Sequence, residues 1–339
     1  MEDNAVQVRW RRGPDGRPGV ADFTGLRPGR RHVLRVTALG GRRVLARTLP
    51  TPPGVELSRF ATINDVHIGC TYFGLLHAMH EPAHAVPHAV RCLQSAVADA
   101  IAWGAELLVV KGDLTHMSRP GEWATVGEVL GNLRVPVVVV PGNHEVKPGR
   151  PSEPQPGLAR HGLHLVHGVE VIDLRGVRLI LVDSTVAERD HGRIAHVADD
   201  IARRAERAPD SVVVGMHHNL QRHHVRTLWP PGVPGAESAE FLRKLHAANP
   251  RSLVTTGHTH RHRRAVQEGV TVTEVGSTKD YPGTWTGYVV HEGGLRQVVR
   301  KVSEPSILPW TEHTRWAVGG LWGLYSPGRL RDRCFSVAW

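Results

Sequence analysis

Short apolar runs recur from residue 58 onward, and amphipathic segments separate them. The runs are rich in Val, Ile and Leu, as buried strands are, and they cover Phe60–Asn64, Leu107–Lys111, Val135–Val140, Val177–Val182, Val212–Met216 and Leu253–Thr256. Residues 88–104 repeat apolar side chains at helical spacing and end at Gly104, and similar spacing recurs at 123–133 and 241–245. This alternation predicts an α/β fold in which helices cover a sheet and functional loops gather at the carboxyl ends of the strands.

The first 55 residues have a different pattern. Strand-like pieces alternate with Gly, Pro and Arg turns over Val6–Trp10, Val20–Phe23, His32–Ala38 and Val44–Leu49. The stretch 26–37 resembles the later strands of a fibronectin type III module, with His32 at the place of its corner tyrosine. Pro50–Gly54 has the composition of a stiff linker. We expect three units: a partial fibronectin type III-like β appendage and linker over 1–55, a large α/β domain over 56–300, and a C-terminal extension over 301–339.

The net charge of +10 comes from 42 Lys and Arg against 32 Asp and Glu. Such an excess favours anionic partners, including phosphates and nucleic acid, although scattered arginines also fit a genome-wide codon bias. No run reaches the roughly 18 apolar residues of a membrane-spanning helix, and the start lacks the features of a secretory signal. The three cysteines form no CxxC pair. We therefore expect a cytoplasmic protein with reduced thiols and no membrane partner.

Polar residues follow three of the predicted strands at the point where each strand ends. Asp65 and His67 are two apart, so both point to one side if the chain stays extended. Asp113 comes directly after a Lys-Gly pair, and a carboxylate can bridge two cations because it has two oxygens. Asn143 offers a neutral amide oxygen, and His144 stands beside it. Taken one at a time, each of these residues also fits a turn or a helix N-cap.

Two further strands end in histidines. His217 and His218 follow one apolar run, and His258 and His260 follow another. Histidine is the commonest metal ligand in proteins, and the chain holds 23 of them, largely in loops after apolar runs. A single histidine at a strand end is more often a surface group, but together with the preceding clusters these residues predict a metal site.

In chain order these residues form the set D-x-H, G-D, G-N-H-E, H-H and G-H-x-H. The set resembles the signature of the calcineurin-like metallophosphoesterases, over roughly residues 58–300. The resemblance implies a β-sandwich flanked by helices (αββα). It also implies two divalent metal ions, for which Mn, Fe or Zn suits the oxygen and nitrogen ligands.

The resemblance further implies roles for individual residues. The first ion would be held by Asp65, His67, Asp113 and His260. The second ion would be held by Asp113, Asn143, His217 and His258. Asp113 and His144 would be the catalytic residues, Asp113 as the bridge between the ions and His144 from outside the ligand set.

The resemblance implies a hydrolase that cleaves phosphoester bonds with an activated water. His116 stands where purple acid phosphatases have a tyrosine, and these enzymes lack a histidine at the place of His67. The residues after Asp113 lack the Arg-rich continuation of phosphoprotein phosphatases. The bacterial branch of cyclic-nucleotide and glycerophosphodiester phosphodiesterases therefore fits best, with a small phosphodiester or nucleotide as substrate. A nuclease acting on DNA or RNA, a phosphomonoesterase and a non-catalytic metal-binding scaffold stay open.

Substrate contacts are less well determined. If residues 77–88 are helical, their histidines would line one wall of the site or bind a further ion, although two prolines interrupt the stretch: His77, His80, His84 and His88. Substrate contact and solvated loop position are both open for His116, His191, His218, His223 and His224. For the Trp-containing tail, packing on the core or at a homo-oligomer interface is favoured over base stacking.

Overall fold

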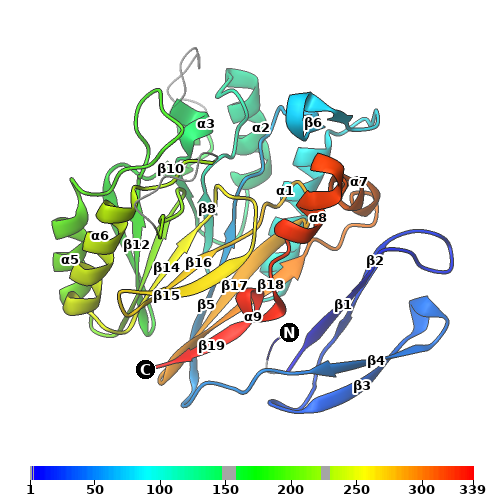
Figure 1. Ribbon diagram of the computed structural model, residues 1–339, viewed down its shortest axis with the longest axis horizontal. Coiled ribbons are helices and arrows are strands. Elements are labelled where there is room, and N and C mark those ends of the chain that lie inside the picture. Colours follow the sequence, from blue (N-terminus) through cyan, green and yellow to red (C-terminus); the bar gives the residue numbers. More distant parts are fainter. Residues whose placement is uncertain (1, 3, 147–157, 223–229) are drawn as a thin grey trace.

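Two β-sheets lie face to face at the centre of the computed structural model, which describes residues 2, 4–146, 158–222 and 230–339 (Figure 1). The first sheet has the strand order β10-β9-β8-β5-β17-β18-β19. Its strands are β5 (Glu56–Ile63), β8 (Leu108–Lys111), β9 (Val137–Val140), β10 (His164–Leu165), β17 (Thr284–His291), β18 (Gly294–Lys301) and β19 (Phe335–Ala338). Strands β5, β8, β9 and β10 are parallel, and β17 to β19 extend the sheet in antiparallel fashion.

The second sheet has the strand order β11-β12-β13-β14-β16-β15. Its strands are β11 (Val169–Leu174), β12 (Val177–Val182), β13 (Ser211–Met216), β14 (Ser252–Thr256), β15 (Arg263–Gln267) and β16 (Val270–Glu274). The four inner strands are parallel, and both edge strands are antiparallel to their neighbours. All six predicted apolar runs overlap strands of these two sheets.

The space between the sheets is filled by apolar side chains from both. Phe60 of β5 stacks on Tyr288 of β17 at 4.7 Å between ring centroids, and both are buried. Leu179 and Val213 belong to the same buried cluster from the other sheet. This layer buries every second residue of each strand, and helices bury the residues between them on the outer faces. The runs are therefore almost continuously apolar.

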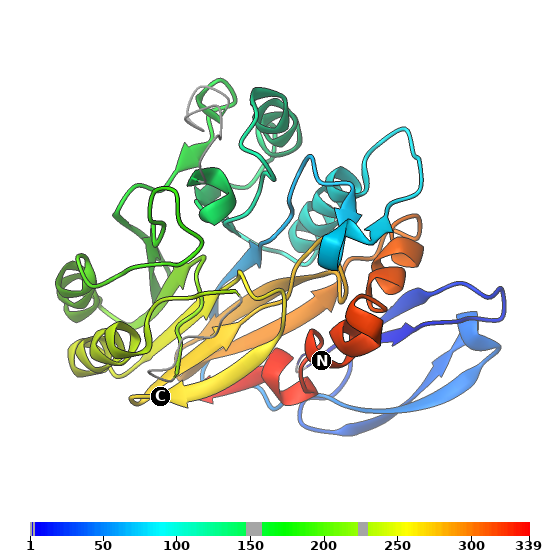
Figure 2. The same cartoon turned by 45° about the horizontal axis from the view of Figure 1, so that its top comes forward.

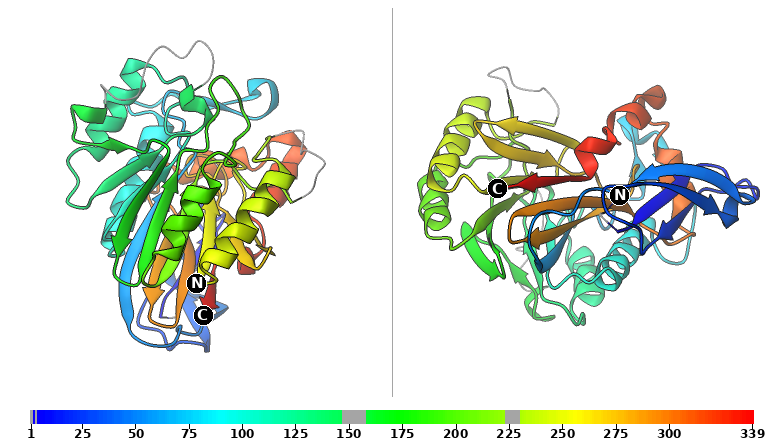
Figure 3. Two further views of the ribbon diagram at one scale, coloured as in Figure 1. Left: turned by 90° about the vertical axis from the view of Figure 1, so that its left-hand side faces the viewer. Right: turned by 90° about the horizontal axis from the view of Figure 1, so that it is seen from below.

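Helices cover both outer faces, as the view from below shows (Figure 3). The helices α1 (His88–Ala102) and α2 (Pro120–Leu130) pack on the seven-stranded sheet, and α5 (Ala198–Glu206) and α6 (Gly235–Ala248) pack on the six-stranded sheet. Leu93 and Trp123 are buried in the first outer layer, and Ile201 and Phe241 in the second. The predicted αββα fold is therefore confirmed.

The N-terminal strands form two antiparallel hairpins. They are β1 (Val6–Trp10), β2 (Gly19–Phe23), β3 (Arg31–Val36) and β4 (Arg42–Arg47). They share a small apolar cluster that contains Val6 and Leu34, and Gln7 exchanges hydrogen bonds with the backbone of Lys301. The predicted N-terminal β segment is present, and its likeness to a fibronectin module stays a prediction.

The C-terminal segment packs on the core, beside the N-terminal strands (Figure 2). It contains α7 (Leu308–Thr314), α8 (Leu321–Tyr325), α9 (Leu330–Arg333) and strand β19. Leu308 and Trp310 of α7 are buried, and β19 pairs with β18. A short hairpin formed by β6 (Tyr72–Phe73) and β7 (Met79–His80) lies near α8. Its Phe73 ring contacts Trp322 of α8 edge to face.

The hypothesis of a helical histidine wall over residues 77–88 is wrong. His77 ends a short 3-10 turn, His80 lies in β7, and His84 is exposed in a loop. Of these four histidines only His88 belongs to an α-helix, α1, where it is buried. The two prolines and the β6–β7 hairpin prevent a continuous helix here. Among the described helices, none has the length and apolarity that crossing a membrane requires.

Candidate metal centre

Five strand ends meet at one edge of the sandwich. Strands β5, β8 and β9 are parallel neighbours in one sheet, and β13 and β14 are parallel neighbours in the other. Each is followed within a few residues by one or two of the predicted ligands. Because the carboxyl ends of parallel strands lie at the same edge, these loops gather in one place, as the sequence predicts. The short helix α3 (Asn143–Val146) begins at this edge.

Two glycines allow the loops to approach closely. Gly112 has a φ of +75°, and a Cβ built on it would lie 2.3 Å from Nδ1 of His217. A Cβ on Gly142 would lie 2.4 Å from the backbone nitrogen of Asp113. Real Cβ atoms do not approach other heavy atoms this closely, so only glycine fits at either position.

The backbone is strained at the candidate ligands themselves. Positive φ angles between +50° and +68° occur at Asp65, His67, Asp113, His258 and His260. Residues with a Cβ avoid this left-handed region, at a cost of roughly 1–2 kcal/mol each. Strain that recurs at one cluster of polar residues is typical of a functional site.

The first group of ligand-type atoms lies at the ends of β5 and β14. Nε2 of His67 is 3.2 Å from Nε2 of His260, which is 3.4 Å from Oδ1 of Asp65. Oδ2 of Asp113 is 3.8 Å from Nε2 of His67. The backbone amide of His258 donates to the Asp65 carboxylate at 3.1 Å, which holds that side chain in position.

The second group lies at the ends of β9, β13 and β14. Nε2 of His217 is 3.1 Å from Oδ1 of Asn143 and 3.1 Å from Nδ1 of His258. It is also 3.4 Å from Oδ1 of Asp113. Asp113 therefore faces both groups, one carboxylate oxygen toward each. All seven predicted ligands are brought together in these two groups.

The spacing of these atoms fits a metal ion. Ligand atoms that share one ion at about 2.0–2.2 Å lie roughly 3.0–3.5 Å from one another. Most of the distances above fall in this interval. Imidazole, amide and carboxylate ligands without thiolate suit Mn, Fe or Zn. The residues present therefore fit the metal that the sequence predicts.

The buried carboxylates of the site also favour a positive charge nearby. Burial opposes protonation of His217, yet the Asp113 carboxylate raises the pKa of this imidazole to about 9. Burial likewise opposes protonation of His260, yet Asp280 and Asp65 raise its pKa to about 9. The buried Asp113 has its pKa held well below the usual range by its histidine neighbours. A bound cation would supply the charge that protons otherwise bring to this cluster.

The carbonyl and carboxylate groups behind the ligands orient them. Nδ1 of His260 lies 2.9 Å from Oδ1 of the buried Asp280, and Nδ1 of His217 lies 3.1 Å from the carbonyl oxygen of Lys111. Each partner accepts a hydrogen bond, so the opposite ring nitrogen faces the site. Asp280 follows β16 and has no role in the sequence analysis. A lone Asp in a Ser-Thr-Lys-Asp turn carries no signal by which sequence could find it.

Glu145 ties two loop segments together, residues 113–115 and 142–145. Its carboxylate accepts hydrogen bonds from the backbone amides of Gly142, Asp113 and Thr115, at 2.8 to 2.9 Å, and from the Thr115 hydroxyl. Burial raises the pKa of Glu145 to about 7, and the nearby Asp113 charge adds to this. Glu145 is a positioning residue, because it holds Asp113 and the Asn143 loop without facing the cavity.

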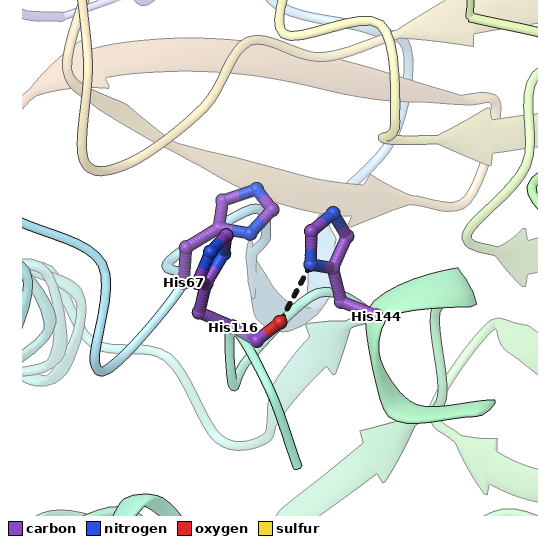
Figure 4. A group of neighbouring side chains, drawn as sticks. All are labelled: His67, His116 and His144. Carbon is purple, nitrogen blue, oxygen red and sulfur yellow. Dashed lines mark hydrogen bonds between the residues drawn. The ribbon is translucent and has the colours of Figure 1, made fainter. Parts of the chain in front are cut away.

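His144 lies at the rim of the first group, beside His67 and His116 (Figure 4). Its Nδ1 is 2.8 Å from the carbonyl oxygen of His116, which can only accept, so Nδ1 carries the hydrogen. The other nitrogen, Nε2, lies 4.0 Å from Oδ2 of Asp113. The His116 ring stacks on His144. Its Nε2 forms a hydrogen bond with the Tyr72 hydroxyl at 2.8 Å.

A cavity of about 640 Å³ opens over both groups. His67, Asp113, Asn143, His258 and His260 line it, together with His144 and His116. This volume falls within the usual range for small-molecule sites. His77 also lines the cavity, and its ring contacts that of Tyr72 at a 30° tilt, with 3.8 Å between ring centroids.

The other singled-out residues lie in several places. His218 is buried behind the second group, with Nδ1 2.9 Å from Oγ of Ser184. The loop that carries His191 reaches this ring at Gly192. Cys70 lines the cavity and contacts the Tyr72 carbonyl oxygen. The predicted contacts His223 and His224 lie outside the described residues.

Comparison with known proteins gives a family. Residues 58–262 match the calcineurin-like phosphoesterases. The glycerophosphodiester phosphodiesterase GpdQ of Enterobacter lignolyticus is 32% identical over 120 residues, 33% of this chain and 41% of that protein. A probable cyclic nucleotide phosphodiesterase of Psychrobacter arcticus is 24% identical over 178 residues, 51% of this chain and 63% of that protein. The chain thus spans less than two thirds of either relative.

A solved structure has a similar fold. The dimetal phosphatase from Danio rerio superposes with a TM-score of 0.53 at 14% identity. The superposition covers 74% of this chain and 98% of the phosphatase.

Proposed function

Because the chain belongs to the calcineurin-like phosphoesterase family, we propose that it hydrolyses phosphodiesters with two divalent metal ions. The observation that carries the proposal is the position of Asp113, whose Oδ2 lies 3.8 Å from Nε2 of His67 and whose Oδ1 lies 3.4 Å from Nε2 of His217. One carboxylate oxygen toward each group is the arrangement of a bridging ligand.

We assign each group one ion. The first ion would be held by Asp65, His67, Asp113 and His260. The second ion would be held by Asp113, Asn143, His217 and His258. Mn, Fe and Zn are the candidates, since all accept mixed oxygen and nitrogen ligands. Two ions at these positions would activate a water molecule for attack and neutralise charge on the phosphoryl group.

His144 acts as the proton donor to the leaving oxygen. The His116 carbonyl oxygen fixes the hydrogen on Nδ1, so Nε2 is the nitrogen that faces the cavity and can carry a transferable proton. General acids of this kind contribute roughly 10² to 10⁴ in rate.

A diester is favoured over a monoester by two observations. The two curated relatives are named as phosphodiesterases. The cavity extends well beyond the ligand groups, so a second substituent on phosphorus has room. A phosphodiesterase therefore fits the site better than a phosphomonoesterase.

Hydrolysis of bis-p-nitrophenyl phosphate by protein loaded with Mn²⁺, Fe²⁺ or Zn²⁺ tests the proposal. Asp113→Asn keeps the shape of the side chain and removes its charge, so it should abolish turnover and release one or both metals. Rates with p-nitrophenyl phosphate, cyclic AMP and single-stranded DNA, measured in parallel, compare the activities of a phosphomonoesterase, a cyclic-nucleotide phosphodiesterase and a nuclease. If the metal-loaded protein cleaves none of these four substrates, the non-catalytic metal-binding scaffold is favoured instead.

A further inference from the structure

One wall of the cavity is apolar and comes from two segments far apart in sequence. Phe73 and Leu75 belong to the β6 hairpin and the turn after it, and Val318, Leu321, Trp322 and Tyr325 belong to the C-terminal segment around α8. The two segments touch where the rings of Phe73 and Trp322 meet edge to face, 5.4 Å apart. They form a continuous surface, which we call the apolar wall.

The apolar wall begins beside the metal ligands. The ring of Trp322 lies 6.2 Å from that of His260, centroid to centroid, and 5.6 Å from the ring of Tyr325. A group attached to a phosphate at the metal centre would therefore extend along these side chains. Leu75 and Leu321 are 63% and 62% exposed, so the wall reaches the mouth of the cavity.

Three polar groups on this side of the cavity are already engaged within the protein. The Tyr72 hydroxyl pairs with Nε2 of His116 at 2.8 Å, and Nε1 of Trp322 donates to the carbonyl oxygen of Tyr281 at 3.1 Å. Nζ of Lys279 donates to the Tyr72 carbonyl oxygen. Among the described residues that line the cavity, Lys279 is the only lysine or arginine.

These observations disfavour a polar occupant. A nucleobase or a second phosphate would lose its hydration here, and the three engaged groups would give it few hydrogen bonds in return, which costs free energy. An apolar chain gains free energy from the same surface. Because Lys279 is the only lysine or arginine among the described lining residues, the net charge of +10 is not concentrated at this cavity.

We infer that the substrate is a phosphodiester in which one esterified alcohol carries an apolar chain, and that this chain lies along the apolar wall. The inference rests on the proposed function, because the phosphate must sit at the metal centre. It makes the C-terminal segment a determinant of substrate specificity rather than a purely structural extension.

Alkylphosphonates test the inference, because their P–C bond is not hydrolysed. Methyl-, butyl- and octylphosphonate are used as competitive inhibitors of bis-p-nitrophenyl phosphate hydrolysis by the Mn²⁺-loaded protein. Each added methylene should lower the inhibition constant by up to about fourfold, from ~0.8 kcal/mol per buried methylene. Calorimetry of octylphosphonate binding should give a more negative heat-capacity change than methylphosphonate.

A matched pair of double variants isolates the wall. Leu75→Ala/Leu321→Ala removes two side chains that line the cavity, whereas Leu76→Ala/Leu324→Ala removes their neighbours, 98% and 79% exposed, which do not. The first variant should lose the preference for octylphosphonate by roughly tenfold or more and keep the methylphosphonate constant. The second should behave as the unaltered protein.

The outcomes separate the inference from the proposed function. Turnover with inhibition constants that do not depend on chain length would overturn the inference alone. Stronger inhibition by adenosine monophosphate than by octylphosphonate would also overturn it, in favour of a nucleotide. No turnover with any of the three metals would overturn the proposed function, and the inference with it.

Discussion

The buried carboxylate of Asp280 lies 2.9 Å from Nδ1 of His260, the imidazole that faces both Asp65 and His67. The Ser277 hydroxyl holds Asp280 from behind, with its oxygen 2.7 Å from the same carboxylate oxygen. A carboxylate behind a ligating histidine fixes the ring orientation and increases its basicity. Asp280 would therefore act on the proposed first ion through His260, without binding it.

Asp280→Ala should weaken binding of the first ion by about 10- to 100-fold. Asp280→Asn keeps an oxygen that can accept from Nδ1 and should recover part of this loss. Calorimetric titration of the metal-free protein, prepared with a chelator, with Mn²⁺ measures the affinity. As a control, Asp173→Ala removes an exposed carboxylate paired with Arg178 and should leave the titration unchanged. Equal affinities for the two alanine variants would refute the positioning role.

Gly112→Ala should displace His217 and remove the second ion. The new Cβ would lie 2.3 Å from Nδ1 of His217, on a backbone with φ +75°. Gly162→Ala is a matched control, because Gly162 has a similar φ of +66° and no atom within 4 Å of the added Cβ. Both variants should lose about 1–2 kcal/mol of stability from left-handed strain. Only Gly112→Ala should also lose half of the bound metal, measured by elemental analysis.

His144→Ala should lower kcat by roughly 10² to 10⁴ for a diester with an alkyl leaving group. The loss should be much smaller for bis-p-nitrophenyl phosphate, because nitrophenolate leaves without a donated proton. His164→Ala, at an exposed ring paired with Glu170, serves as the control. The same loss for both substrates would argue that His144 stabilises charge and does not donate the proton.

His88 should make the free energy of unfolding depend on pH. Burial lowers the pKa of this imidazole from 6.5 to about 4, so the unfolded chain binds the proton more readily than the folded chain. The stability that the neutral ring contributes is present above pH 6.5 and is lost as pH falls toward 4. At pH 5 the loss is about 2 kcal/mol, from 1.36 kcal/mol per unit.

Urea unfolding of the chelated protein at pH 7 and pH 5 measures this effect. His88→Gln should remove about 2 kcal/mol of the difference between the two pH values. His84→Gln changes an exposed histidine nearby and should keep the difference. A His88→Gln variant with the full pH dependence would show that other groups carry it.

Much of the fold follows from the pattern of apolar runs. Six runs predict β5, β8, β9, β12, β13 and β14, and all six are strands of the sandwich. The hairpin of β17 and β18 was not predicted, although it lies between β5 and β19 in the first sheet. Strand β17 is buried throughout, yet polar residues interrupt its apolar ones, so it forms no apolar run in the sequence.

The sequence by itself predicts the candidate ligands, because they follow five strands whose carboxyl ends lie at one edge of the sandwich. It could not determine the partners behind the ligands or the wall of the cavity. Asp280 reaches His260, and Trp322 reaches Phe73, through contacts between segments that are distant in the chain. Local periodicity reports which face of an element is buried, but it carries no information on which distant side chain lies against that face. Only the packing of these distant segments around the strand ends decided what surrounds the candidate metal centre.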